Sequence, residues 1–258
     1  YSPDNFTWPD GLFWNLRMND LLKKMLGAHG GLERWQTIRK ISADFSPSGI
    51  ALVARGQEAF TKMSTRVDVD TRAQRVSIFP FIHLNQRARY EPYRTLVESS
   101  DGRVLEKLER PRASFGNSAA GAKWSANQLA YFIGCALWTY FTLPFSLVGH
   151  GVIVRQGELW TESAEEIWQT LELTFPEAYA THSSQQTIYI DASGLIRRHD
   201  YSLEIAGNSK AAHYLLDYQV FDGFAFPTKR RIFLRDERRP LKDRLVIQAD
   251  LGNYELTY

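Results

Sequence analysis

The chain has a single cysteine, Cys135, among its 258 residues. One thiol cannot form an intrachain disulfide, so a disulfide-stapled fold is excluded. The thiol lies in an apolar stretch with no cation beside it, and we expect a buried, unreactive side chain. No secretory signal is visible either. These two features together predict a cytoplasmic protein.

An excess of charge of either sign is also missing, because 31 basic and 29 acidic residues give a net charge of +2. A dedicated nucleic-acid binder needs a basic face, so we expect no nucleic-acid partner. The densest basic cluster runs from Lys229 to Arg239 and alternates between the two faces of a strand. We interpret it as a solvated edge. The alternative that this basic cluster favours is a membrane-surface or partner-binding module.

Several catalytic motifs are absent. The sequence has no P-loop, no GxGxxG and no GxSxG elbow, which argues against nucleotide cofactors and serine-hydrolase chemistry. Its six histidines show no HxH, HxxxH or HxxE spacing, so we predict neither a metal site nor a cofactor. The one long apolar stretch, 126–141, is too short and too aromatic for a transmembrane span. We therefore expect no integral membrane segment.

Aromatic residues, in contrast, are abundant at 13% of the chain, and 44% of residues are hydrophobic. Large β-proteins use aromatic side chains to fill wide cores, and a lined hydrophobic cavity has the same composition. We predict one domain over 1–258. Its parts are an N-terminal arm (1–10) and helices within 1–40, a first strand set in 41–110, a buried helix at 125–141, and a second strand set in 152–258.

The helices are predicted from apolar spacing. An apolar stripe predicts a helix over 16–26, ended by Gly27. Ser125 and Gln128 form a capping box before a helix that is apolar nearly all round, so this helix must be buried on most sides. Its Tyr131 and Trp138 are candidate ligand-binding residues, with core filling as the alternative.

The strands are predicted from alternation and from β-branched or aromatic runs. In the first set they cover 41–45, 50–54, 59–69, 75–79, 94–99 and 104–108, and the second set begins with 152–155, 159–161 and 168–175. Residues 186–258 then form one antiparallel meander with strands at 186–191, 195–205, 211–221, 226–235 and 245–258. About ten strands are expected in all.

The turns of this meander predict which residues lie side by side. A tight turn at Asp222-Gly223 puts Thr228 opposite Asp217 and Arg230 opposite Leu215. A turn centred on Asn208 puts His199 opposite Asp217. The expected polar row then crosses four strands on an otherwise apolar face, with Tyr201 and Arg230 in the next row; its members are Gln186, His199, Asp217 and Thr228.

This row is the candidate site. Asp217 would orient the imidazole of His199 and make it a general base, Tyr201 would donate a proton, and Arg230 would hold an oxyanion or a carboxylate. The alternative is a cross-strand ion pair on a wetted face. Around the row we expect further ligand contacts from Gln186, Thr228, Leu215 and from His182 in the loop before the meander.

The predicted fold class is α+β and mostly antiparallel β: a strongly curved sheet or incomplete barrel of about ten strands, with a buried central helix and short N-terminal helices. This order of parts resembles the LolA/LolB-like fold of bacterial lipoprotein carriers. The opening run from Leu21 to Leu32, with Trp35 and Ile38, carries the likeness, together with the strand ends 189–191, 194–197 and 226–228. The resemblance implies an apolar cavity under a curved sheet.

Two functions fit this fold, besides the surface module named above. The first is a binding protein that encloses a hydrophobic or amphipathic small molecule, such as a lipid, polyketide or terpenoid. The second is a cofactor-independent isomerase, cyclase or hydrolase that uses His199 and Asp217 for proton transfer. The two hypotheses share a cavity and differ in whether the polar row faces it. The oligomeric state is left open.

Overall fold

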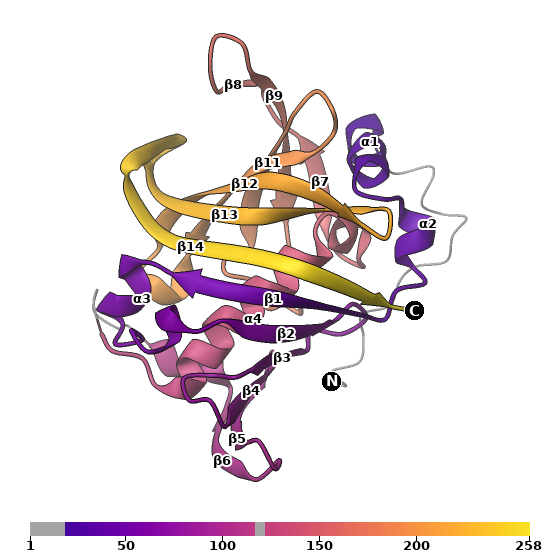
Figure 1. Cartoon of the computed structure of the whole chain (residues 1–258). Helices are drawn as coiled ribbons and strands as arrows, with labels where there is room; N and C mark the ends of the chain where they lie inside the picture. Colours follow the sequence, from indigo (N-terminus) through magenta and orange to yellow (C-terminus); the bar gives the residue numbers. More distant parts are fainter. Residues whose placement is uncertain (1–18, 117–121) are drawn as a thin grey trace.

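The computed structural model describes residues 19–116 and 122–258, so the predicted arm at 1–10 and the start of the predicted helix at Leu16 lie outside the described residues. Fourteen strands form one antiparallel sheet that is open rather than closed into a barrel (Figure 1). The predicted fold class is confirmed: the sheet is curved, mostly antiparallel, and accompanied by helices. It has more strands than expected.

Two meanders build the sheet. The first contains β1 (Lys40–Ser48), β2 (Thr65–Asp70), β3 (Val76–Phe79), β4 (Gln86–Glu91), β5 (Arg94–Ser99) and β6 (Val104–Glu109). The second contains β7 (Ile153–Gln156), β8 (Trp160–Thr161), β9 (Ile167–Thr174), β10 (Gln185–Ile190), β11 (Ile196–Leu203), β12 (Ser209–Phe221), β13 (Phe224–Asp236) and β14 (Arg239–Thr257).

The first and last strands join the two meanders. Lys40 of β1 lies opposite Thr257 of β14 on one side and opposite Asp70 of β2 on the other. The strand order is therefore β6-β5-β4-β3-β2-β1-β14-β13-β12-β11-β10-β9-β7, with β8 beside β9. The sheet is open because β6 and β7, at the two ends of this row, do not pair with each other.

The helix α4 (Ala126–Thr142) connects the two meanders and lies inside the curve of the sheet (Figure 1). Ser125 and Gln128 form the predicted capping box. Thirteen of its seventeen residues are buried, as its apolar circumference predicts. It packs mainly against β2–β6, and Gly134 brings its backbone close to Tyr90 of β4.

Two short helices, α1 (Asp20–Ala28) and α2 (Leu32–Trp35), precede the sheet. Asn19 caps α1 by accepting a hydrogen bond from the backbone N–H of Leu22 at 2.7 Å. The predicted apolar stripe is buried, and Trp35 stacks on Phe145 with ring centroids 4.3 Å apart. Phe145 belongs to η3 (Phe145–Val148), one of four 3₁₀ segments with η1 (Phe60–Lys62), η2 (Pro111–Phe115) and η4 (Glu204–Ala206).

Two predictions in the first strand set are wrong, and one strand was missed. Residues 50–54 are the helix α3 (Ile50–Ala54) and not a strand, because β1 stays paired with β14 as far as Ser48 and forms no hairpin. Residues 59–64 contain η1, and β2 begins only at Thr65. The strand β4 was not predicted at all, since Arg87 and Arg89 obscure its alternation.

The terminal meander has the predicted five strands, and the register of its β12–β13 hairpin is confirmed. Asp222 and Gly223 form a two-residue turn between Phe221 and Phe224, and Leu215 lies opposite Arg230. Thr228 is the neighbour of Asp217, since its hydroxyl donates to the Asp217 carbonyl oxygen at 2.7 Å. The tight turn determines this register, and the pairs on both sides of Asp217 and Thr228 keep to it.

The predicted register between β11 and β12 is wrong by four residues. His199 lies opposite His213 and not opposite Asp217, and Tyr201 lies opposite Ala211. The strand β11 ends at Leu203, and the connection continues through η4 and then Gly207 and Asn208, both at positive φ. A shift by an even number of residues keeps the same side chains on the inner face but changes every cross-strand neighbour.

Candidate functional site

The inner face of β10, β11, β12 and β13 collects most of the residues predicted for the site. The buried members are Gln186, His199, Tyr201, Leu215 and Arg230, joined by His182 from the loop before β10. His213 of β12 belongs to the same group and was not among the predicted residues. Two other predicted residues lie on α4, and two lie toward solvent.

Three buried histidines form the centre of this group, which we call the histidine cluster (His182, His199 and His213). The rings of His199 and His213 have centroids 6.1 Å apart, and Tyr201 lies 4.9 Å from His199 and 5.9 Å from His182. Nε2 of His199 lies 2.5 Å from Oε1 of Gln186. The predicted contact between Gln186 and His199 is therefore present, although the two residues are diagonal and not directly opposite.

Burial keeps these rings neutral. It lowers the pKa of His182 to about 3, with the positive charge of Arg112 adding to the effect. It lowers the pKa of His199 to about 3 as well, helped by Arg230 and His182. The pKa of His213 is shifted in the same direction for the same reason. Neutral imidazoles accept and donate single hydrogen bonds, and they carry no charge of their own near neutral pH.

Arg230 borders the histidine cluster and is only 3% exposed. Its Nη2 donates to the backbone carbonyl of Tyr140 on α4 at 2.8 Å, and its guanidinium lies over the Tyr140 ring at 4.2 Å from the centroid. Its Nη1 lies 3.5 Å from Nε2 of His213. Arg230 thus connects the sheet to α4.

The structure does not bring His199 and Asp217 together. Asp217 adopts φ 52°, which breaks the alternation of β12 and turns its side chain to the exposed face. There it is 54% exposed and pairs with Lys229 at 2.6 Å. Thr228 lies beside it and is only partly buried. The predicted His–Asp acid–base pair is therefore not formed.

An enclosed cavity of about 20 Å³ lies between α4 and the central strands. Its walls are mostly apolar, with three polar side chains; they come from Phe45, Pro47, Leu52, Phe132, Ile133, Ala136, Leu137, Tyr140, His182, Tyr201, Leu203, Ile232, Ile247 and Ala249. This volume is about the size that one water molecule requires. The packing of α4 against β1, β13 and β14 is therefore incomplete at this place.

A groove of about 660 Å³ opens to solvent where the two ends of the sheet approach each other. The turn between β4 and β5, η2, α4 and the loop 176–184 line it, and Tyr131 of α4 forms part of its wall. Arg112 lies at its side, where Nη1 donates to the Thr181 carbonyl at 2.7 Å and Nη2 pairs with Glu204. Tyr131 was a predicted ligand-binding residue, whereas Arg112 was missed because the segment containing it shows no periodicity.

The loop 176–184 separates the groove from the cavity. Glu177, Tyr179 and Thr181 line the groove, whereas His182 lines the cavity and stacks on Phe132 with centroids 4.9 Å apart. Trp138, the other predicted residue of α4, lines neither space. It is buried, and its Nε1 donates to the Asp70 carbonyl at 3.1 Å, so its place is in the core.

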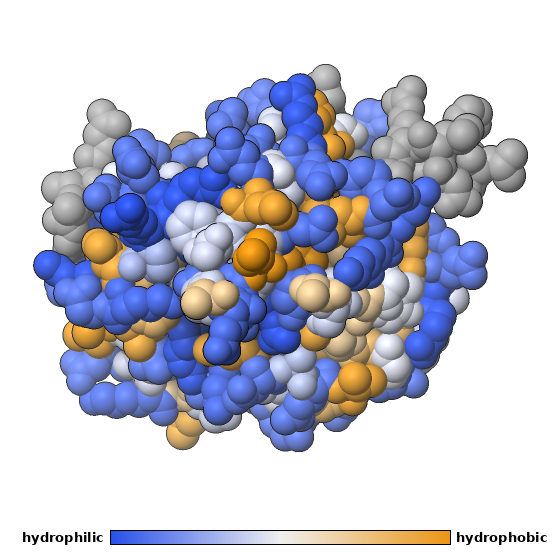
Figure 2. All heavy atoms as spheres, turned by 90° about the horizontal axis from the view of Figure 1, so that it is seen from above, coloured by the Kyte–Doolittle hydropathy of each residue, from blue (hydrophilic) through white to orange (hydrophobic). Residues whose placement is uncertain are grey.

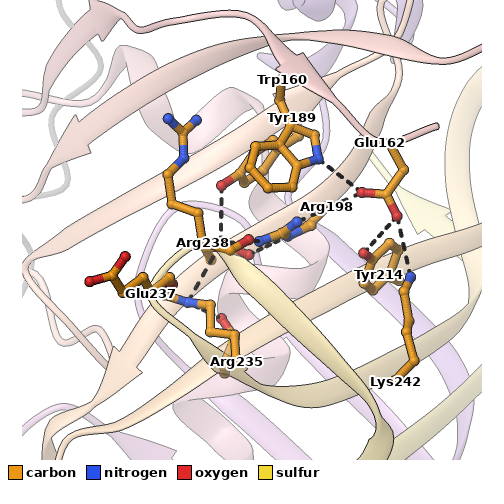
Figure 3. Close-up of polar contacts among 11 residues, drawn as sticks. Trp160, Glu162, Tyr189, Arg198, Tyr214, Arg235, Glu237, Arg238 and Lys242 are labelled. Carbon is orange, nitrogen blue, oxygen red and sulfur yellow. Dashed lines mark hydrogen bonds and ion pairs between the residues drawn. The ribbon is translucent and has the colours of Figure 1, made fainter. Parts of the chain in front are cut away.

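The opposite face of the sheet carries a second polar cluster, around Arg198 (Figure 3). This guanidinium is fully buried and forms hydrogen bonds with both carboxylate oxygens of Asp200 at 2.7 and 2.6 Å. Three aromatic rings surround it, those of Trp160, Tyr189 and Tyr214. Its charge is matched inside the fold by Asp200, and Glu162 lies 3.7 Å from its Nη1, which forms no hydrogen bond.

The outer surface is polar where it is seen from above. Hydrophilic side chains cover most of this face, and apolar side chains form small groups between them (Figure 2). In the part of the chain that the structure describes, no cluster of three or more His, Cys, Asp or Glu residues is arranged to hold a metal ion. Within the same residues, no helix has the length and hydropathy that a membrane crossing requires.

Comparison with known proteins bears on the fold. No protein-family model and no curated protein matches the sequence. Solved structures do match: a LolA superfamily protein from Nitrosomonas europaea has a TM-score of 0.51 at 11% identity, and the match covers 92% of this chain and 94% of that one. The protein has a LolA-like fold. A DUF1329 family protein from Desulfovibrio piger matches at TM-score 0.51 and 12% identity, with the same coverage.

The predicted cytoplasmic location is contradicted by these comparisons. The finding that overturns it is the likeness in fold to the LolA superfamily protein. The prediction rested on the single cysteine and on the lack of a visible secretory signal. A protein whose core is large enough needs no disulfide in any compartment, so cysteine usage does not decide the location.

Proposed function

We propose that the protein binds a hydrophobic or amphipathic small molecule, of the lipid, polyketide or terpenoid type, between the curved sheet and α4. The observation that carries the proposal is the position of α4, an apolar helix inside an open sheet beside a mostly apolar cavity. Both walls of the interior are apolar there. A ligand that separates them breaks no hydrogen bond of the strand ladders, which run within the sheet.

The place where the sheet is open supports a route for the ligand. The groove of about 660 Å³ lies at this gap, and its volume falls within the range of small-molecule sites. The loop 176–184 and α4 contribute residues to both the groove and the cavity. We infer that the ligand enters by the groove and extends along α4 into an enlarged cavity.

The binding test uses a neutral hydrophobic dye, Nile red, titrated into the purified protein and displaced by palmitate and by hexadecanol. Native mass spectrometry of the freshly purified protein provides the second readout, as added mass from a co-purified apolar molecule. Saturable dye binding that a lipid displaces supports the proposal. A protein that binds neither dye nor lipid, in the absence of a co-purified ligand, contradicts it.

A pair of matched variants locates the site. Ala136→Leu adds bulk at the cavity wall, and we expect dye and lipid affinity to fall by about tenfold, as for a mismatched group in an apolar pocket. Ala54→Leu adds the same side chain on the exposed surface of α3 and should leave affinity unchanged. Equal affinity in the two variants would place the ligand elsewhere.

The enzyme hypothesis receives no comparable support. It depended on His199 and Asp217 as an acid–base pair, and the two side chains lie on opposite faces of the sheet. The surface-module hypothesis depended on the basic strand. Positive charges of this strand are neutralised by ion pairs such as Lys229 with Asp217 and Arg231 with Asp250.

A further inference from the structure

Arg230 and Arg198 are buried to a similar degree on opposite faces of the same sheet, but only one of them has an acid. Arg198 pairs with Asp200 and lies 3.7 Å from Glu162. For Arg230, no carboxylate lies within 4.0 Å among residues 19–116 and 122–258, and its partners are a backbone carbonyl, an aromatic ring and a neutral imidazole. A cation is therefore buried in the interior without a counter-ion.

Such an arrangement is costly. Removing an ion from water costs several kcal/mol even after the protein relaxes. The Tyr140 ring and one carbonyl hydrogen bond offset part of this cost. A guanidinium that served only to fill space would be replaced at little loss by an apolar side chain of similar volume. An anion supplied from outside is the partner that the site lacks.

The unsatisfied atoms around Arg230 are donors. Nε of Arg230 and Nδ1 of His213 are buried and form no hydrogen bond. Because a guanidinium can only donate, Nε2 of His213 is the acceptor toward Nη1, and the proton of the neutral ring is therefore on Nδ1. Two unpaired N–H groups and a full positive charge require an acceptor with negative charge.

The position fits the polar end of a bound amphipathic molecule. Ile232, two residues after Arg230 on the inner face of β13, lines the cavity, and so does Tyr140, whose ring covers the guanidinium. A chain that extends along α4 into the enlarged cavity would bring its end group to this wall. One guanidinium neutralises one charge, and its fork geometry matches a carboxylate bidentately.

We propose that Arg230 binds the carboxylate of a fatty-acid-type ligand, with Nδ1–H of His213 as a further donor and the apolar chain extended along α4. This rests on the proposed function, and it names the class of molecule that the site selects. The carboxylate takes the free edge of the guanidinium and leaves the hydrogen bond to the Tyr140 carbonyl in place.

The experiment compares palmitate with hexadecanol, which has the same chain length and no charge, by displacement of Nile red at neutral pH. Wild type should bind palmitate about tenfold or more tightly than hexadecanol, the size of a charge-assisted hydrogen bond. Arg230→Met should lose that preference and keep its affinity for hexadecanol. Arg231→Gln, one residue away on the outer face, should retain the preference.

Each outcome separates the two proposals. If neither lipid binds, the proposed function fails. If both bind equally to wild type, or if Arg230→Met keeps the preference for palmitate, the proposed function stands and the role of Arg230 is overturned. A tighter complex with hexadecyl phosphate than with palmitate would overturn the assignment of a carboxylate.

Should Arg230→Met fail to fold, Arg230→Lys replaces it. It keeps the charge and loses the fork, so its preference for palmitate should persist but shrink by several-fold. An undiminished preference in Arg230→Lys overturns the bidentate contact, and the wild-type comparison alone still decides whether the site selects an acid.

Discussion

His199 lies directly opposite His213 on neighbouring strands, and neither ring has a carboxylate partner in the part of the chain that the structure describes. Burial is therefore the main cause that decides their protonation. The pKa of His199 is lowered to about 3 by burial and then by the charge of Arg230, and that of His213 is lowered for the same reasons. Together with His182, whose pKa is also about 3, they place several neutral imidazoles in the core.

The first prediction is that the protein loses stability in mild acid. Above pH 6.5 these histidines are neutral in both the folded and the unfolded chain. Below it the unfolded chain takes up protons and the folded chain does not, down to the lowered pKa values. The free energy of unfolding should therefore fall between about pH 6.5 and 4, by about 1.4 kcal/mol for each pH unit and each such histidine.

Urea unfolding at a series of pH values checks this. His213→Gln removes one titrating group and should make the acid slope shallower by about one proton. A slope that is the same in wild type and His213→Gln would mean that the His213 ring is accessible to protons in the folded state.

The second prediction concerns Asp217. Asp217→Asn should change the free energy of unfolding by less than about 0.5 kcal/mol, because the side chain is exposed and its pair with Lys229 is screened by solvent. Asn also tolerates the positive φ of 52°. Asp217→Val, which does not, should destabilise by about 1–2 kcal/mol. Chemical denaturation measures both, and a large loss in Asp217→Asn would indicate that the carboxylate faces the interior.

The sequence predicted the fold better than the site. Alternation and turn residues placed the five strands of the terminal meander, and Asp222-Gly223 determined the β12–β13 register, because a two-residue turn leaves one pairing possible. The capping box at Ser125 located the start of α4, and the predicted end of the helix lies within one residue of the observed end. These signals are local, so they survive without tertiary information.

The site required distances that the sequence does not contain. The connection between Leu203 and Ser209 includes a 3₁₀ turn, since the backbone N–H of Glu204 bonds to the His182 carbonyl from a distant loop. This contact is tertiary, so the sequence does not reveal it. As a result, His199 lies opposite His213 and not opposite the predicted Asp217. The left-handed backbone conformation at Asp217 also turns its side chain to the outer face of the sheet, whereas the inner face was predicted. Arg230 was predicted correctly on the inner face, because the tight turn specifies its neighbour Leu215.

The third prediction tests the burial of α4. Trp138→Ala should destabilise the protein by about 3–5 kcal/mol, the usual cost of removing a large aromatic side chain from a core. It removes a buried ring and the hydrogen bond from Nε1 to the Asp70 carbonyl. Tyr93→Ala, at an exposed aromatic residue, should cost less than about 0.5 kcal/mol. Thermal melts that show no difference between the two variants would place α4 at the surface.

The last prediction compares glycine-to-alanine substitutions at two helical positions. Intrinsic helix propensity predicts that both substitutions stabilise the protein, whereas packing predicts that one stabilises it and the other destabilises it. Alanine in place of glycine inside a helix is favourable by about 1 kcal/mol. At Gly27 of α1 a Cβ would meet nothing within 4 Å, so Gly27→Ala should stabilise the protein by about 0.5–1 kcal/mol. At Gly134 of α4 the added Cβ would lie 2.3 Å from Cβ and Cγ of Tyr90.

Because Tyr90 is buried on β4, it cannot move aside without separating α4 from the sheet. Gly134→Ala should therefore destabilise by about 1–3 kcal/mol or more, through overpacking. Differential scanning calorimetry of the two variants should give melting temperatures displaced in opposite directions from wild type. A rise in both would mean that α4 and β4 lie farther apart than in this structure. The space for a ligand beneath the sheet would then exist without any movement of the helix.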